Sequence, residues 1–249
     1  MPDRRKHRGP HPEDERLFAP EVLPRLRAAA ADLAWLLSRG YAQDSSLKLV
    51  GDRYSLVARQ RTAVARSVCS HVTAVRRGEK TVPAEAMEDA VLWIDGYNVL
   101  TTVEAALAGG VVLAARDGAF RDMASMHGSF RKVDETLPAL KILGQIIAEM
   151  QPGRCVWFLD RPVSNSGRLR AIMLKTSDRY GWSWEVELVP DPDSVLVGAS
   201  PECVIATADS ALLDRCHRWV NLARLAVERC VPDAWMIDFR NVSIAAPDS

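Results

Sequence analysis

The chain has 249 residues, a formal net charge of zero and an apolar fraction of 48%, which exclude a disordered chain and allow one large domain or two smaller ones. No apolar run approaches the roughly 18 residues of a membrane span, and the charged N-terminal segment lacks the apolar stretch of a secretory signal. The five cysteines form no Cys-x-x-Cys pair, which is typical of reduced thiols. We therefore expect a cytoplasmic protein with no membrane partner.

The N-terminal part is basic and carries helical patterns. Residues 1–85 contain 16 Lys+Arg and 10 Asp+Glu, whereas residues 86–249 contain 16 and 22. We predict a loose segment over 1–12 and a small, basic, mainly helical domain over 13–85, in which 46–56 forms a hairpin or loop. A basic domain suits a polyanion, although ordinary scatter of charge explains the same counts equally well.

Residues 86–249 alternate short apolar runs with helical patterns. The expected strands are rich in β-branched and aromatic residues and cover 91–95, 109–117, 155–160, 182–191, 203–209 and 234–239. The expected helices cover 136–150, 166–181 and 210–230. This alternation predicts an α/β domain, with a mostly parallel sheet and helices on both of its faces.

Aspartates stand at the ends of several expected strands. They are Asp95, Asp117, Asp160, Asp191, Asp193 and Asp209. The carboxyl ends of parallel strands share one edge of a sheet, so we expect these side chains to converge there. Taken singly, each is more simply explained as a helix N-cap. Taken together, they would raise one another's pKa unless a cation neutralised them, and oxygen donors favour Mg²⁺ or Mn²⁺.

Two of these strand ends resemble motifs of a known family. The segment IDGYNVL at 94–100 resembles the opening strand of PIN-like nucleases of the NYN and YacP-type branch, and VIATADSAL at 204–212 resembles their later Thr-x-Asp motif. The whole chain is also similar to a two-part family in which domain of unknown function four-three-four precedes a PIN-like domain. The stretches HPEDERLFAP, ARDGAFRDMASMHGSFRKVDET and PVSNSGRLR carry that similarity.

The resemblance implies a PIN-like fold for residues 86–249 and a set of site residues. Asp95 and Asp209 match metal-ligand positions, Asn98 matches the asparagine that supports the site, and Ser210 follows the Thr-x-Asp motif. Asp160 matches a further acid, and Asp193 lies roughly where the branch has an acid after alanine, although proline precedes it here. A helical acid between the strands has four candidates, namely Asp117, Asp122, Asp134 and Glu135. The implied catalytic residues are Asp95, Asp160 and Asp209, and Asp117 and Asp193 join them as candidate ligands of Mg²⁺ or Mn²⁺.

Two polar stretches are candidates for contacts with a phosphodiester substrate. Ser164 and Asn165 open an expected helix, where backbone N–H groups suit a phosphate and either Arg168 or Arg170 adds charge. An ordinary capped loop explains these residues equally well. Arg131 follows Phe130, a pairing that suits a phosphate beside a stacked base, although a solvated turn is the simpler explanation.

Three functions are consistent with these features. The first is a metal-dependent nuclease that acts on RNA or another nucleic acid, with the basic helical domain as its guide. The second is a PIN-like module that binds RNA or a partner protein without catalysis. The third is an enzyme for a small phosphorylated substrate, against which Tyr97 counts, because an aspartate that forms an acyl phosphate usually has a carboxylate two residues later. The sequence leaves the oligomeric state open, with a homo-oligomer among the options.

Overall fold

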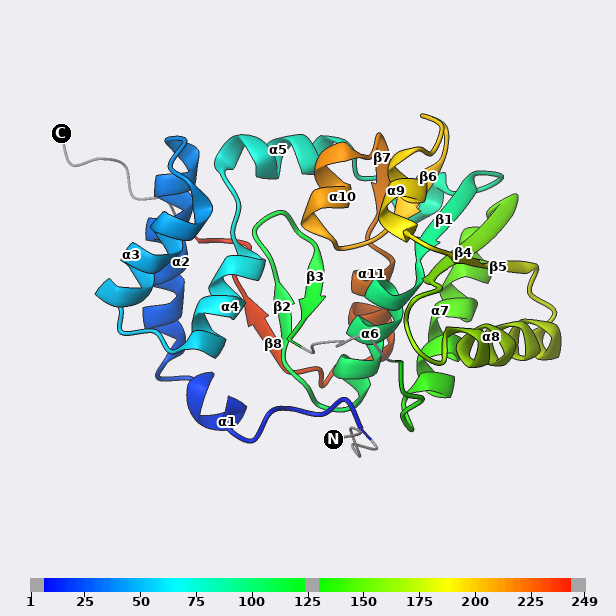
Figure 1. Cartoon of the computed structure of the whole chain (residues 1–249), viewed down its shortest axis with the longest axis horizontal. Coiled ribbons are helices and arrows are strands. Elements are labelled where there is room, and N and C mark those ends of the chain that lie inside the picture. The colour runs from blue at the N-terminus through cyan, green and yellow to red at the C-terminus, as the bar shows by residue number, and fades with distance from the viewer. Residues whose placement is uncertain (1–6, 124–129, 243–249) are drawn as a thin grey trace.

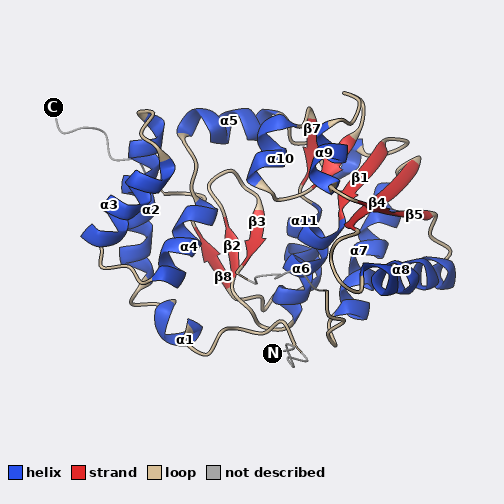
Figure 2. Ribbon diagram, viewed as in Figure 1, coloured by secondary structure: helices blue, strands red, loops and turns tan. Residues whose placement is uncertain are grey.

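The computed structural model describes residues 7–123 and 130–242 of the chain. The molecule is elongated, with N-terminal helices at one end, a five-stranded sheet at the other and a three-stranded sheet between them (Figure 1, Figure 2). The predicted α/β class is therefore confirmed. None of the described helices is long and apolar enough to cross a membrane.

The five-stranded sheet is parallel throughout. Its strands are β1 (Val91–Asp95), β4 (Arg154–Asp160), β5 (Trp184–Val189), β6 (Val204–Ala206) and β7 (Arg218–Val220). They lie in the order β5-β4-β1-β6-β7, so the strand that ends in Asp95 is central. The sequence predicted β7 as part of one helix over 210–230. Its short run contains Trp219, whose Nε1 donates a hydrogen bond of 2.7 Å to the carbonyl oxygen of Arg77, a contact that no local pattern reveals.

Helices cover both faces of this sheet, as predicted. The helices of the α/β region are α6 (Gly96–Leu107), α7 (Thr136–Met150), α8 (Ser166–Tyr180), α9 (Pro192–Val197), α10 (Ser210–Arg215) and α11 (Leu222–Cys230). Leu92 and Ile94 face a core built with α6, α7, α8 and α11. Trp93 faces the other side, where Leu196 of α9 and Leu212 of α10 close a second core. The strands are apolar on both sides because both sides are buried.

A second sheet corrects one sequence prediction. Its strands are β2 (Val112–Ala114), β3 (Phe120–Asp122) and β8 (Met236–Asp238), in the order β3-β2-β8. Strand β2 pairs antiparallel with β3 and parallel with β8. The run at 109–117 was expected to join the same sheet as Asp95, but its strand β2 belongs to a separate sheet. Asp117 lies three residues after the end of β2.

The N-terminal region is helical, and its core is shared with the second sheet. Its elements are α1 (Asp14–Leu17), α2 (Leu23–Ser38), α3 (Gln43–Arg53), α4 (Ala58–Ser67), α5 (His71–Glu79) and the 3₁₀ turn Ala84–Ala86. Leu26 and Leu33 of α2 belong to one hydrophobic cluster with Leu113 of β2 and Ile237 of β8. The predicted hairpin over 46–56 is wrong. The apolar residues Leu47, Val50 and Tyr54 recur at spacings of three and four, and α3 packs them on this core.

Candidate active site

The candidate site lies at the carboxyl end of β1, where the direction of the strand connections reverses. After β1 the chain forms α6 on one face of the sheet, and after β6 it forms α10 on the other. Loops that leave adjacent parallel strands toward opposite faces open a crevice between them, and ligands of open α/β sheets bind there. Asp95 and Asn98 stand on one side of this crevice, and Thr207 and Asp209 stand on the other.

Hydrogen bonds tie the two sides of the crevice together. Thr207 Oγ1 donates to Asp95 Oδ2 at 2.8 Å, and the amide of Ala208 donates to Asn98 Oδ1 at 2.8 Å. Thr207 Oγ1 also accepts from the amide of Asp209 at 3.0 Å. These bonds hold the Asp-Gly-Tyr-Asn motif against the Thr-Ala-Asp motif, which brings together residues more than 100 positions apart in the chain.

Gly96 explains why a glycine follows the first aspartate. A Cβ at this position would lie 2.6 Å from Leu159 Cδ2 and 2.8 Å from the carbonyl oxygen of Phe158. Both distances are below van der Waals contact, and the second neighbour is rigid backbone of β4. Helix α6 therefore starts directly against β4, and Asp95 is held close to the end of that strand.

Within the described residues, no cationic side chain compensates the charge on Asp95. The residue is 9% exposed, and burial raises the pKa of its carboxyl to about 7, with a further rise from the charges of Asp193 and Asp209. The hydroxyl of Thr207 and the amide of Asn98 act in the opposite direction. Asp95 occupies the N-cap position of α6 without a side-chain capping hydrogen bond, and the amide of Asn98 offsets its charge only in part. A carboxylate in this state favours an added cation.

Asp193 and Asp160 belong to the same electrostatic group. Burial raises the pKa of Asp193, and the charges of Asp209, Asp191 and Asp160 raise it further, while Arg215 lowers it. Burial also raises the pKa of Asp160, with an added effect from Asp191. The charges of Asp193 and Asp209 therefore act on Asp95, whereas the charge of Asp160 acts on Asp193 and is not among the influences on Asp95.

Two of the aspartates are also helix N-caps. Asp209 Oδ1 accepts from the amides of Ala211 at 2.8 Å and Leu212 at 3.1 Å, which leaves Oδ2 without a hydrogen-bond partner in the described part of the chain. Asp191 caps α9 through Ser194, and these hydrogen bonds lower its pKa. The capping interpretation is therefore correct for both residues, and only Asp209 keeps a carboxylate oxygen for a ligand in addition.

These side chains fit a divalent cation in their chemistry. They offer carboxylate oxygens, the donors that Mg²⁺ and Mn²⁺ prefer, and Asp95, Asp160 and Asp193 hold their protons more tightly than free carboxyls do. Within residues 7–123 and 130–242, no three Asp, Glu, His or Cys side chains are close enough to hold an ion by themselves. A bound ion would therefore need water or substrate phosphate as additional ligands, which is the usual arrangement for Mg²⁺.

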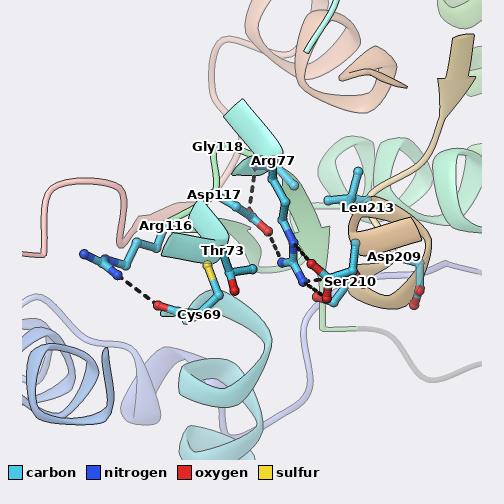
Figure 3. A network of polar contacts seen from close by, with 12 residues as sticks. Cys69, Thr73, Arg77, Arg116, Asp117, Gly118, Asp209, Ser210 and Leu213 are labelled. Carbon is cyan, nitrogen blue, oxygen red and sulfur yellow. Dashed lines mark hydrogen bonds and ion pairs between the residues drawn. The ribbon is translucent and has the colours of Figure 1, made fainter. Parts of the chain in front are cut away.

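Asp117 does not fit the metal site that the sequence assigned to it. Figure 3 shows its carboxylate directed at Arg77, whose Nη1 lies 2.6 Å from Asp117 Oδ2, and Arg121 Nη2 lies 2.7 Å from the same oxygen. Burial alone would raise the pKa of Asp117, but the two guanidinium groups hold it below its ordinary value. In the same figure the Asp209 side chain points away from Arg77. Asp117 therefore has a structural role, because Arg77 and Arg121 already neutralise its charge.

The other three candidates for the helical acid, Asp122, Asp134 and Glu135, contact residues outside the site. Asp122 accepts from the hydroxyls of Thr101 and Thr102, and Asp134 and Glu135 lie beside His7. None of them contributes to the raised pKa values of Asp95, Asp160 and Asp193.

The predicted substrate residues near β4 come together. The amide of Phe130 donates to the carbonyl oxygen of Ser164 at 2.9 Å, and Asn165 Nδ2 donates to the carbonyl oxygen of Phe130 at 3.0 Å. This pairing places the exposed side chains of Arg131 and Arg168 near the start of α8, just beyond Asp160. Ser210 is exposed at the start of α10, and its carbonyl oxygen accepts from Arg77 Nη2 at 3.0 Å.

The sequence analysis missed two residues of the site. Thr207 was not singled out, although it is the threonine of the Thr-Ala-Asp motif. Tyr97 was weighed only against a different chemistry, yet its hydroxyl is buried and has no hydrogen-bond partner within the described residues. Burial and the charge of Asp160 raise the pKa of this hydroxyl, so it remains protonated and can donate to a ligand near Asp160.

The fold and the crevice define an α/β protein with a carboxylate-lined site at the switch point of a parallel sheet. The model of the family described as Domain of unknown function (DUF5616) matches residues 84–225, from the 3₁₀ turn into α11, and the chain belongs to this family. Residues 25–80, from α2 through α5, match Protein of unknown function (DUF434). The predicted likeness to family four-three-four is thus confirmed, whereas no PIN-like or NYN family model matches.

The chain is also similar to a protein from another source along most of its length. The chain is 26% identical over 188 residues to "Uncharacterized protein MJ0935" of Methanocaldococcus jannaschii, which covers 76% of this chain and 88% of that protein. No solved structure matches.

Proposed function

We propose that the protein is a metal-dependent phosphodiesterase that cleaves RNA at the carboxyl end of β1. The observation that carries this proposal is Asp95. It is buried at the switch point, other carboxylates but none of the described cations act on it, and its pKa is raised to about 7. Such a carboxylate is costly to keep in a fold unless a ligand uses it.

The proposed site for Mg²⁺ or Mn²⁺ consists of Asp95, Asp193 and Asp209, with Asp160 at its edge, and bound water would link the ion to the carboxylates that are too far away to bind it directly. When bound, the ion would neutralise these carboxylates, polarise the scissile phosphate and lower the pKa of a water nucleophile. Thr207 would keep Asp95 oriented through its hydrogen bond, and Asn98 would keep the two loops in register.

Side chains around the carboxylates would hold the substrate. Arg131 and Arg168 would hold the phosphate that neighbours the scissile one, because both are exposed cations close to the end of β4. The protonated hydroxyl of Tyr97 would donate to a substrate oxygen near Asp160.

A non-catalytic RNA-binding module is the second candidate. The observation that favours it is the lack of three ligand side chains close enough to hold an ion within the described parts of the chain. This candidate predicts RNA binding without cleavage and without any effect of divalent metal on the site.

Cleavage of end-labelled single-stranded RNA with and without Mn²⁺ tests the proposal. We expect the wild type to cleave in Mn²⁺ and Asp95→Asn to lose at least about 100-fold of this activity. The matched control is Asp44→Asn, at an exposed aspartate at the start of α3, which should keep wild-type activity. Equal cleavage by the two variants, or none by the wild type, would overturn the assignment.

A further inference from the structure

One surface outside the carboxylate crevice combines unpaired cations with exposed aromatic rings. Helix α8 begins after Asn165, next to the candidate site, and ends at Tyr180. In Figure 1 it runs along the edge of the molecule beside β5. Its exposed cations include Arg168, Lys175 and Arg179.

These three cations share one face of the helix. Their spacings of seven and four residues place them in a row on the same side, and the row spans about 16 Å from Arg168 to Arg179 at the helical rise. None of the three forms an ion pair within the described structure. Asp178 is the one acidic residue of α8, and it lies about a quarter turn away from the row.

A stack of aromatic rings lies beside the C-terminal end of the row, and its outer ring, Tyr180, projects about a third of a turn away from the three cations. Tyr180 is 42% exposed, and its ring stacks on Trp182 with centroids 4.8 Å apart and planes 21° apart. Trp182 in turn stacks on the buried Trp184 at 5.1 Å. Lys141 Nζ and Arg179 Cζ lie 6.0 and 5.8 Å from the Tyr180 centroid. The exposed ring is therefore backed by the core and flanked by two cations.

Close packing against α7 fixes this stack. A Cβ on Gly144 would lie 2.0 Å from Trp182 Cζ3, so the indole lies directly on the backbone of α7. A rigid ring loses little conformational entropy when a base stacks on it.

The arginines of α4 are used differently. Arg59 pairs with Asp14, Arg61 Nη2 lies 2.8 Å from Asp52 Oδ1, and Arg66 donates to the carbonyl oxygen of Asp122 at 2.9 Å. These three arginines stabilise the fold and its contact with the second sheet. Helix α4 therefore lacks a row of unpaired arginines like the row of cations on α8.

We propose that α8 is a track for single-stranded RNA. Phosphates would follow the row of cations from Arg168 to Arg179, and a base would stack on Tyr180 at the far end. Unpaired cations along a groove or face together with an aromatic platform are the features that bind single strands without sequence preference. A duplex keeps its bases stacked internally and offers none to Tyr180. This inference rests on the proposed function and adds the strand state and the path of its substrate.

Binding measured without metal separates this inference from catalysis. The anisotropy of an end-labelled single-stranded RNA of about 12 nucleotides is followed in EDTA at low ionic strength. We expect Arg179→Glu to weaken binding at least about fivefold, and Lys175→Glu/Arg179→Glu to lower the salt dependence by about 1.4 in log–log slope. The matched control is Arg25→Glu, an exposed arginine of α2 without an ion pair, which should stay within about twofold of the wild type.

The stacking step has its own pair of variants. Tyr180→Ala should weaken binding roughly tenfold, and Tyr180→Phe, which keeps the ring, should bind as the wild type does. Duplex RNA should compete less well than single-stranded RNA of the same length, because it offers no free base to Tyr180. Equal losses in Arg179→Glu and Arg25→Glu, no loss in Tyr180→Ala, or equal competition by duplex and single-stranded RNA would overturn the track. If the track variants bind normally while Mn²⁺-dependent cleavage occurs, only the track fails. If the wild type binds along α8 but never cleaves, only the nuclease fails.

Discussion

Asp95 and Asp117 both follow short buried strands, yet the chain treats their charges in opposite ways. Asp117 lies between Arg77 and Arg121, which hold its pKa below the ordinary value. Asp95 faces Asp193 and Asp209, and its pKa is raised to about 7. The difference shows that this fold supplies cations where a buried carboxylate has only to be stable. At the end of β1, Arg215 acts on Asp193, and none of the described cations acts on Asp95, so a ligand would have to supply the positive charge there.

The two carboxyls therefore have opposite effects on stability as pH changes. Asp117 has a lowered pKa, so its contribution is present above the pKa of the unfolded chain and is lost as pH falls through the folded value. Asp95 has a raised pKa, so the folded state binds its proton more tightly than the unfolded state does. The free energy of unfolding then falls as pH rises from about 4 to about 7.

Removing a cation from the compensated site should have the largest effect. Arg77→Met leaves Asp117 with Arg121 alone and removes the bonds from Arg77 to Asp214 and to the carbonyl oxygen of Ser210. We expect the free energy of unfolding to fall by about 3–5 kcal/mol, measured by urea denaturation. The control Arg76→Met removes an exposed partner of Asp214 and should cost no more than about 1 kcal/mol. Similar losses in both variants would show that burial of Arg77 has no special role.

Removing the charge from the uncompensated site should stabilise the fold. A shift of about three pKa units corresponds to as much as about 4 kcal/mol, so Asp95→Asn should raise the free energy of unfolding at about pH 8 by up to this amount. The gain should shrink as the pH is lowered from about 7 toward 4, because the wild-type carboxyl is then protonated in the folded state and leaves no buried charge to relieve. A series of urea denaturations across this range provides the measurement. Destabilisation by Asp95→Asn at high pH would mean that another group of the chain already compensates the charge.

The close approach of α6 to β4 provides an intermediate effect. Gly96→Ala forces its Cβ against Leu159 and the carbonyl oxygen of Phe158, which should cost about 1–3 kcal/mol and displace Asp95. Gly78→Ala is the control, because a Cβ there has no neighbour within 4 Å. If Gly96→Ala is as stable as the wild type, the glycine is not what holds Asp95 at the end of β4.

The smallest expected effect concerns the hydrogen bond that partly offsets the charge of Asp95. Thr207→Val keeps the shape of the side chain and removes the hydroxyl that donates to Asp95 Oδ2. The pKa of Asp95 should rise further, and the free energy of unfolding should fall by about 1–2 kcal/mol near pH 8. Carboxyl titration by NMR reports the pKa directly. An unchanged pKa would remove Thr207 from the account of the site.

The sequence predicted the acidic crevice better than it predicted the compensated site. Asp95 and Asp209 could be found because each stands at a fixed place after an apolar strand, and the parallel sheet brings such ends together. Asp117 looked the same in the sequence. Its difference arises from Arg77, which lies 40 positions earlier on α5 and reaches Asp117 only in the folded chain. Strand spacing carries no information about such a partner.

The order of the strands was also beyond a reading of local patterns. The α/β class follows from alternation along the chain, but the split into two sheets follows from the way the N-terminal helices cover Leu113 and Ile237. Strand β7 was missed because three residues are too few for a periodic signal between two helices. Tyr97 was underestimated because its burial without a hydrogen-bond partner is a property of the tertiary structure.

Thermal unfolding in a titration with Mn²⁺ tests the central claim most directly. A ligand that binds only the folded state must raise its stability by mass action, and a saturating excess of about 100 times the Kd adds about 2.7 kcal/mol. We predict that Mn²⁺ raises the Tm of the wild type and of Asp44→Asn but leaves the Tm of Asp95→Asn unchanged. The rise in the wild-type Tm should be larger at about pH 8 than at about pH 5. Equal shifts in wild type and Asp95→Asn, or no shift in either, would contradict a cation site at the end of β1.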